Sequence, residues 1–284
     1  MKNKKSFWGT VLVLCIIGCI ACAGYVIYRL VDQMQADQNI EKIQNEVMQN
    51  TPTPTPESTP AVDGPDNSEF TGEQDGEAAR IPEGVVLNME NPIDFGKLQE
   101  INPDLYAWIR IEDTQIDYPI AQRSGDDSFY LHHDLYGESR YAGCIYTEDK
   151  NSKDFSDPNT VIYGHNMKNG TMFKGLHKFE DETFFKEHPF VYIYMPDRVL
   201  VYEVFAAYIY DDRHILNSFD FSDESVFESY LNDVMHVRSF GAHLRDDLNL
   251  TVKDRIITLA TCVGGQPDNR FLVQAVLVKD SRNE

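Results

Sequence analysis

The chain has 284 residues, of which 42% are hydrophobic, and it carries 46 acidic against 25 basic side chains, for a formal net charge of −21. Such an acidic chain argues against nucleic acid and anionic lipid headgroups as partners, because both would be repelled. Its length allows one large domain or two small ones.

An apolar run near the N-terminus predicts a membrane anchor. Residues 7 to 28 are uncharged and mostly apolar, and about 20 such residues cover a bilayer core as a helix. Three lysines precede the run and Arg29 follows it. Because positive charge stays cytoplasmic, we expect a cytoplasmic tail at 1–6, a single transmembrane anchor at 7–30 and an extracellular remainder in the cell membrane. The sequence "ACAG" within the run leaves a cleaved signal peptide open as the alternative.

A polar segment follows the predicted anchor. Residues 31–84 are expected to form a short juxtamembrane segment and then a disordered linker, since 51–80 are rich in proline, threonine, serine, glycine and acid and cannot bury a core. This linker would hold the next domain away from the membrane. The folded domain is expected at 85–284, which is long enough for one hydrophobic core.

The predicted domain is mainly β with flanking helices. A short helix is expected within 91–105, two more within 171–188 and a stronger one at 222–239, where apolar residues recur at helical spacing. Several of the β segments are apolar on both alternating faces, which favours a barrel or sandwich covered by helices. Eight strands are predicted, at 105–111, 116–120, 142–147, 160–164, 190–195, 199–210, 255–262 and 270–278.

Two cysteines lie outside the apolar run, Cys144 and Cys262. Two cysteines do not make a disulfide scaffold; they could pair with each other, or one could be a working thiol. Cys262 ends a predicted strand, a Gly-Gly loop follows, and Arg270 opens the next strand. A hairpin here would bring the guanidinium near the thiol.

One histidine has a placement typical of catalysis. His165 directly follows the predicted strand "TVIYG" and precedes a polar loop. His132 and His133 are adjacent, but no second ligand cluster accompanies them at a familiar spacing, so we predict no metal site. The remaining histidines, including His177, stand in helical or polar contexts without companions.

Together these segments resemble one family. "TLATC" at 258–262, "IYGHNM" at 162–167 and Arg270 opening the last strand are similar to the sortases, membrane-anchored cysteine transpeptidases of Gram-positive bacteria. The longer "YGHNMKNGTMF" pattern and the helix before the cysteine strand resemble class B. The resemblance extends from about residue 94 to 278. It implies an eight-stranded sortase-type β-barrel, the same number of strands as predicted from the residues.

The resemblance also implies site roles. Cys262 would be the nucleophile, His165 the acid/base and Arg270 the group that stabilises the oxyanion or holds the substrate backbone, without a metal or cofactor. The implied substrate-binding residues are Tyr163, Leu131, Thr261 and Ala260. Many relatives have serine where Ala260 stands, and asparagine where Asp127 stands, so the hydroxyl and the side-chain amide that those relatives could offer a substrate are missing here.

The implied reaction is acyl transfer. Cys262 would cleave a C-terminal sorting signal after threonine, and the thioester would pass to an amine. The expected partners are sorting-signal-bearing surface proteins or pilins, a cell-wall precursor or other amine acceptor, and the membrane through one N-terminal helix; nucleic acid is not expected. Two alternatives fit the same residues: a thiol endopeptidase that uses water, and a non-catalytic surface scaffold.

Overall fold

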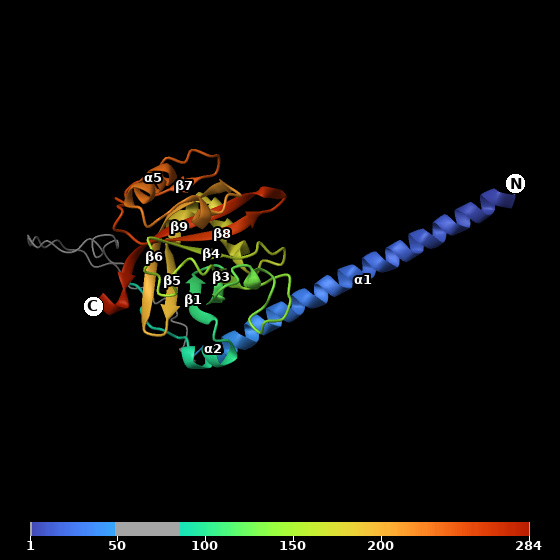
Figure 1. Cartoon of the computed structure of the whole chain (residues 1–284), viewed down its shortest axis with the longest axis horizontal. Coiled ribbons are helices and arrows are strands. Elements are labelled where there is room, and N and C mark those ends of the chain that lie inside the picture. Colours follow the sequence, from blue (N-terminus) through green and yellow to red (C-terminus); the bar gives the residue numbers. More distant parts are fainter. Residues whose placement is uncertain (1, 49–85, 284) are drawn as a thin grey trace, which may run out of the picture.

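The computed structural model describes residues 2–48 and 86–283 (Figure 1). The linker predicted at 51–80 lies outside these residues. The described part contains a long N-terminal helix and a domain of mostly β structure with short helices around it.

Eight strands of the domain close into a barrel, as the sequence predicted. The sheet order is β5–β1–β2–β3–β4–β8–β9–β6, and pairing of β6 with β5 closes the ring. The β2–β3 and β4–β8 pairs are parallel, and the other neighbours are antiparallel. The barrel strands are β1 (Leu105–Ile111), β2 (Asp117–Ala121), β3 (Ile145–Thr147), β4 (Asn159–Tyr163), β5 (Phe190–Met195), β6 (Arg198–Asp211), β8 (Ile256–Val263) and β9 (Gln266–Asp280).

A further strand, β7 (His243–Leu244), was not predicted. It pairs with Ala206 and Ala207 of β6, beyond the part of β6 that pairs with β5. A strand of two residues is too short to show alternation in the sequence. It extends the sheet at one end of the barrel without changing the closure.

Both faces of the strands are buried, which explains their continuous apolar runs. Along β8, Ile257 and Leu259 belong to one core cluster, whereas Ile256 and Ala260 belong to the other. Alternate residues of a strand point to opposite faces, so each strand contributes to both clusters. The barrel is therefore packed inside and covered outside.

Short helices cover the barrel. The 3-10 helix η2 (Phe173–Glu180) packs into the first cluster, and α5 (Glu224–Met235) packs into the second. Asp223 caps α5 by accepting a hydrogen bond from the Ser225 amide, as its position before the helical pattern indicates. The other helices are α2 (Phe95–Ile101), η1 (Phe129–Leu131), α3 (Glu182–Glu187), α4 (Ile215–Ser218) and η3 (Ser281–Asn283).

The N-terminal helix α1 (Lys2–Val47) is continuous through the predicted anchor and the juxtamembrane segment. Its N-terminal half projects away from the barrel, and its C-terminal part lies against the domain (Figure 1). Asp32, Ala36, Ile43 and Val47 are buried, and their spacing of four, seven and four residues places them on one helical face. Within the described residues, α1 is the one helix long and apolar enough to cross a membrane.

Candidate active site

Parallel pairing of β4 with β8 brings the two predicted catalytic segments together. Tyr163 lies opposite Ala260 in this pair. The Gly164 amide donates to the Ala260 carbonyl at 3.2 Å, and Thr261 Oγ1 donates to the Gly164 carbonyl at 2.8 Å. Because the strands run in the same direction, His165 leaves β4 at the end of the barrel where β8 delivers Cys262.

Glycine before His165 is required by close packing. A Cβ atom on Gly164 would lie 2.5 Å from Ile145 Cδ1 and 2.7 Å from the Phe173 ring. Real Cβ atoms do not approach other atoms so closely, so any side chain here would push β4 away from its neighbours. The glycine therefore lets the backbone pack closely against Ile145 and Phe173 directly before the histidine.

The β8–β9 hairpin places Arg270 beside Cys262, as predicted. The two residues are direct partners in the antiparallel register. The Cys262 side chain is exposed and its thiol is free. Arg270 Nη1 donates to the carbonyls of Pro267 and Asn269, at 2.8 and 3.1 Å. Its Nε and Nη2 groups have no hydrogen-bond partner in the described chain, so they are available to an incoming oxyanion or carbonyl.

His165 is held by a backbone carbonyl and aromatic rings. Its Nε2 atom lies 2.9 Å from the Leu131 carbonyl oxygen. Since a carbonyl only accepts, Nε2 carries the proton and the Nδ1 lone pair is left for acid/base chemistry. The Tyr141 ring stacks on the imidazole, with centroids 5.5 Å apart and planes at 17°. The His132 ring is 6.3 Å away.

Burial sets the charge state of His165. It lowers the pKa of the imidazole below its ordinary 6.5, and the hydrogen bond to Leu131 acts against this shift. Charge on His132 would lower the pKa further. Desolvation disfavours the imidazolium, so His165 is neutral at pH 7.

The predicted substrate-binding residues occupy different surroundings. The Tyr163 ring lies near Tyr146 and His214, with centroid distances of 5.4 and 6.2 Å. Its hydroxyl is buried and has no hydrogen-bond partner among the described residues. Ala260 and Thr261 are buried, and the Thr261 hydroxyl already binds the Gly164 carbonyl. Asp127 accepts a hydrogen bond from the Asp149 amide at 2.6 Å.

The two cysteines of the domain are both free thiols. Cys144 is buried, and burial raises its pKa well above 9, with a further contribution from Asp134. It is therefore an inert, protonated side chain rather than a disulfide partner of Cys262.

Sequence reasoning missed a cluster behind Cys262. Asn166 Nδ2 donates to the Cys262 carbonyl at 2.8 Å, and His177 Nε2 lies 3.1 Å from the same oxygen. His177 Nδ1 in turn contacts Glu180 Oε1 at 2.6 Å, and its ring stacks on Phe271. The expectation that His177 has no companion was wrong. The three-residue spacing of His177 and Glu180 could have revealed this pair, because residues three positions apart lie on the same face of a 3-10 helix.

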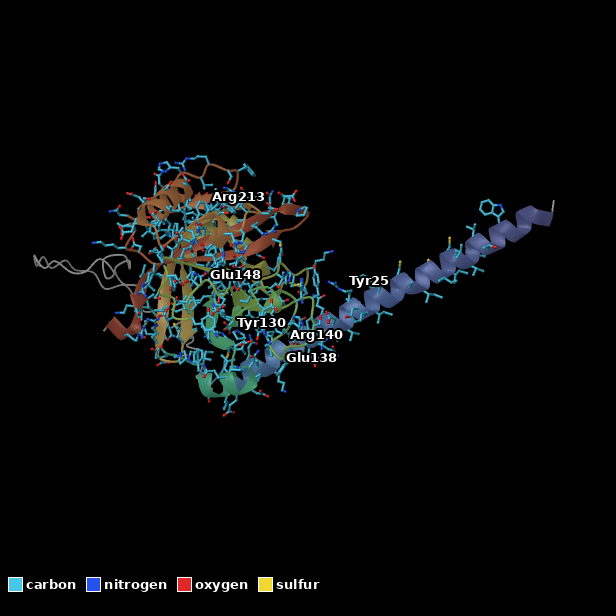
Figure 2. The ribbon with its side chains drawn as sticks, in the orientation of Figure 1. Tyr25, Tyr130, Glu138, Arg140, Glu148 and Arg213 are labelled. Carbon is cyan, nitrogen blue, oxygen red and sulfur yellow. The ribbon has the colours of Figure 1, made fainter. Side chains whose placement is uncertain are left out.

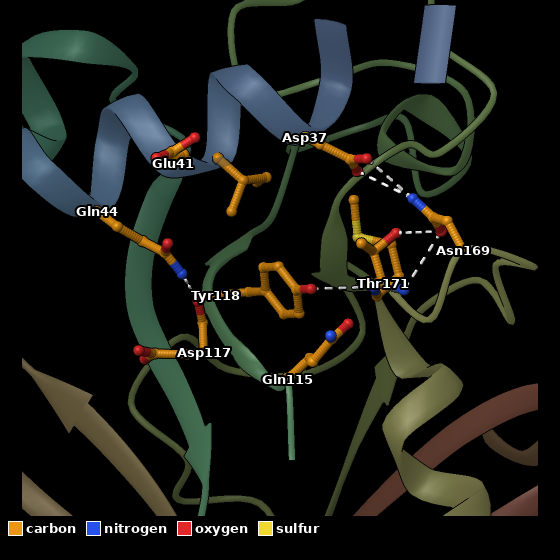
Figure 3. A pocket seen from close by; sticks show the side chains of 10 residues that line it. Asp37, Glu41, Gln44, Gln115, Asp117, Tyr118, Asn169 and Thr171 are labelled. Carbon is orange, nitrogen blue, oxygen red and sulfur yellow. Dashed lines mark hydrogen bonds between the residues drawn. The ribbon is translucent and has the colours of Figure 1, made fainter. Parts of the chain in front are cut away.

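A groove of about 480 Å³ lies between α1 and the barrel (Figure 3). None of the predicted site residues lines it. Its walls include Asp37, Ile40, Glu41 and Gln44 of α1, and Gln115, Asp117, Tyr118, Asn169, Thr171 and Met172 of the domain.

Comparisons with known proteins agree on one family. A family model described as a sortase domain matches residues 109–278. Sortase B of Listeria monocytogenes is 35% identical over 190 residues, which is 66% of this chain and 75% of that protein. Sortase B of Staphylococcus aureus is 29% identical over 189 residues, with the same coverage.

Solved structures show the same fold. The crystal structure of Clostridium perfringens sortase B is 34% identical, with a TM-score of 0.59, and the match covers 66% of this chain and all of that one. The structure of B. anthracis sortase B in complex with AAEK1 is 28% identical, with a TM-score of 0.64, and the match covers 88% of this chain and 99% of that one.

Proposed function

Because this chain belongs to the sortase family of cysteine transpeptidases and its relatives place it in class B, we propose that it cleaves a C-terminal sorting signal of the form x-P-x-T-(G/N) after the threonine and transfers the new acyl group to an amine. One observation carries this proposal. The ends of β4, β8 and β9 bring His165, Cys262 and Arg270 to one site.

In the first half-reaction, neutral His165 takes the Cys262 proton on Nδ1, and the thiolate attacks the threonine carbonyl carbon. The carbonyl electrons move to oxygen, and the Arg270 guanidinium stabilises the resulting anion with its unpaired N–H groups. When the intermediate collapses, the C–N bond breaks and the leaving amine takes the proton from His165. The product is a thioester on Cys262 and the released tail of the signal.

In the second half-reaction, an acceptor amine attacks the thioester and gives its proton to His165. The thiolate of Cys262 leaves and is reprotonated by His165. An amide replaces the amide that was cleaved, so protons and electrons balance without another reactant. We propose an amine of a cell-wall precursor or of a pilin as the acceptor.

The four predicted substrate-binding residues would hold the signal. Tyr163 offers a buried hydroxyl that has no hydrogen-bond partner within residues 2–48 and 86–283, and a substrate carbonyl or amide could satisfy it. Leu131 acts through its carbonyl on His165 and could also contact substrate with its half-buried side chain. Thr261 would contribute by tying β8 to Gly164, and Ala260 by packing alone.

We also propose that α1 anchors the enzyme. Its first half is exposed and apolar, as a membrane span requires. The lysines at its N-terminus favour a cytoplasmic tail, which would place the barrel outside the cell among sorting-signal-bearing surface proteins or pilins.

The test uses the full chain in detergent micelles with a fluorogenic sorting-signal peptide and an added glycine-based amine. Peptide cleavage and a ligated product identified by mass should both require Cys262 and His165. Arg270→Lys should be slower than the wild type, because lysine lacks the planar guanidinium that presents several N–H donors at once. Activity that survives in Cys262→Ala would overturn the proposal. If water alone resolves the thioester under every amine supplied, the endopeptidase alternative holds instead.

A further inference from the structure

The end of the apolar run in α1 contacts a loop that covers the predicted active site. Asp32 is buried and accepts a hydrogen bond from Arg140 Nη1 at 3.1 Å. Its other oxygen lies 3.4 Å from the Tyr141 amide. Arg140 also contacts Asp134 and Glu138 of the same loop. Figure 2 shows Glu138 and Arg140 beside α1, where the helix leaves the barrel.

The next contact reaches the imidazole through one aromatic ring. The Arg29 guanidinium lies over the Tyr141 ring, 3.8 Å from its centroid. The same ring stacks on His165. Arg29 is the first charged residue after the apolar run. A single tyrosine therefore separates the predicted general base from the membrane-facing end of the helix.

Helix α1 also holds the loop on the other side of His165. Asn169 Nδ2 donates to both carboxylate oxygens of Asp37, at 3.2 and 2.9 Å (Figure 3). Asn169 Oδ1 in turn accepts from the Thr171 amide and hydroxyl. An isolated bridge pairs Asn166 with Met172 and closes this loop directly after His165. Both chain segments that carry or cover the imidazole are thus tied to one face of α1.

We propose that the segment Arg29–Asp37 of α1 positions His165 for catalysis, with Arg29, Asp32 and Tyr141 as positioning residues. The inference rests on the proposed role of His165 and extends the active site to the anchor helix. Tyr141 fixes the plane of the imidazole and shields it from water, while Arg29 and Asp32 keep the ring in place. None of the three touches the reacting atoms.

Of the three, Arg29 and Tyr141 contribute little to holding the helix on the domain, whereas Asp32 is buried and paired with Arg140. The apolar contacts come from Ala36, Ile43 and Val47, further along α1. Tyr141 is 49% exposed, so its truncation removes little buried area. A loss of activity at Arg29 or Tyr141 therefore separates positioning from folding, because the melting temperature of these variants should stay close to that of the wild type.

The experiment measures kcat, KM and the pH profile of peptide cleavage by the full chain in micelles. Arg29→Met and Tyr141→Ala should each lower kcat, the latter by about 10-fold, because small misplacements of an acid/base group are costly. KM should stay within about twofold, since substrate contacts are kept. Tyr141→Phe should retain near-normal kcat, because the ring makes the contact, and Gln35→Ala, on the exposed side of the same helix, should match the wild type.

The pH profile adds a readout that folding would not move. The titratable and charged groups that the structure places around the imidazole are His132 and Tyr141 of the covering loop and, behind Tyr141, Arg29 of α1. The proposed reaction adds the Cys262 thiol of β8. Removing the Tyr141 ring exposes His165 to water, so the acid limb of kcat/KM should move to higher pH.

Unchanged kcat and an unchanged acid limb in both Arg29→Met and Tyr141→Ala would overturn the inference. That result leaves the proposed function intact as long as Cys262→Ala is inactive. Activity in Cys262→Ala would instead remove the proposed function itself.

Discussion

The side-chain amide of Asn166 donates a hydrogen bond to the carbonyl oxygen of Cys262 across 2.8 Å. The residue that follows the predicted general base therefore holds the backbone of the predicted nucleophile. His177 lies within reach of the same oxygen, and Glu180 orients His177. The contact falls where the pairing of β8 with β9 changes register, after Cys262. It thus fixes the strand end at a point where the ladder is irregular.

Replacing Asn166 with alanine should loosen this strand end. The lost hydrogen bond is worth about 1 kcal/mol, and the displaced thiol should lower kcat by about 5- to 10-fold with little change in KM. Lys168→Ala is the matched control, since this exposed residue lies in the same loop. Steady-state kinetics with the sorting-signal peptide decide the matter, and a wild-type kcat in Asn166→Ala would contradict the positioning role.

His165 should titrate below the ordinary histidine range. Burial lowers its folded-state pKa, so the unfolded chain binds more protons between that value and about 6.5. Stability should therefore fall as pH drops through this window and be unaffected by His165 above it. NMR titration of the imidazole Hε1 signal gives the pKa directly. The free energy of unfolding, measured with denaturant, should depend less on pH between pH 7.5 and 5 in His165→Gln than in the wild type. An NMR titration midpoint of the His165 imidazole at or above pH 6.5 would refute the prediction.

The two domain cysteines should differ sharply in reactivity. Cys262 is exposed, while burial keeps Cys144 protonated. Iodoacetamide at pH 7.5 should alkylate the Cys262 peptide and leave the Cys144 peptide unmodified, as mapped by mass spectrometry. Cys144→Ala should keep its transpeptidase activity and lose about 1 kcal/mol of stability from the small cavity. Equal rates of alkylation at both residues would show that Cys144 is accessible.

Most of the barrel was predictable because its longer strands are β-rich and bounded by turns. The run "RIITLATC" became β8 within one residue at each end, and the return to Arg270 became the β8–β9 hairpin, although β9 begins at Gln266 rather than at Arg270. The two-residue strand β7 carries no such signal. The positions of Cys262 and Arg270 follow from local chain order, so the sequence could place them.

The surroundings of His165 were not predictable in the same way. Tyr141, which stacks on the imidazole, and Arg29, which covers that ring, come from segments far apart in the chain. The face of α1 that packs on the domain starts with Asp32 and Ala36, which lie in a polar stretch. The hydrophobic periodicity of this part of the helix is therefore weak. Those contacts depend on tertiary packing, which no local pattern encodes.

A buried ion pair links β6 to β9, and breaking it should destabilise the barrel. Arg198, at the start of β6, contacts Asp280, at the end of β9, at 3.0 Å, and both side chains are 4% exposed. Removing Arg198 leaves the buried Asp280 carboxylate with its more distant partners Arg255 and Arg282, at 3.9 and 4.0 Å. The loss should therefore lie at the lower end of the roughly 3–5 kcal/mol typical of a broken buried pair. Arg198→Ala should therefore lower the melting temperature by at least about 6 °C, measured by scanning fluorimetry.

The exposed pair of Lys186 and Glu182 provides the control. Lys186 Nζ lies 2.6 Å from Glu182 Oε1, and the two side chains are 64% and 65% exposed. Solvent screens such a pair, so Lys186→Ala should leave the melting temperature close to that of the wild type. Since Asp280 lies ten positions along β9 from Arg270, the folded fraction of Arg198→Ala should keep the wild-type kcat below its melting temperature. Equal destabilisation by the two substitutions would show that burial does not set the strength of the Arg198–Asp280 pair.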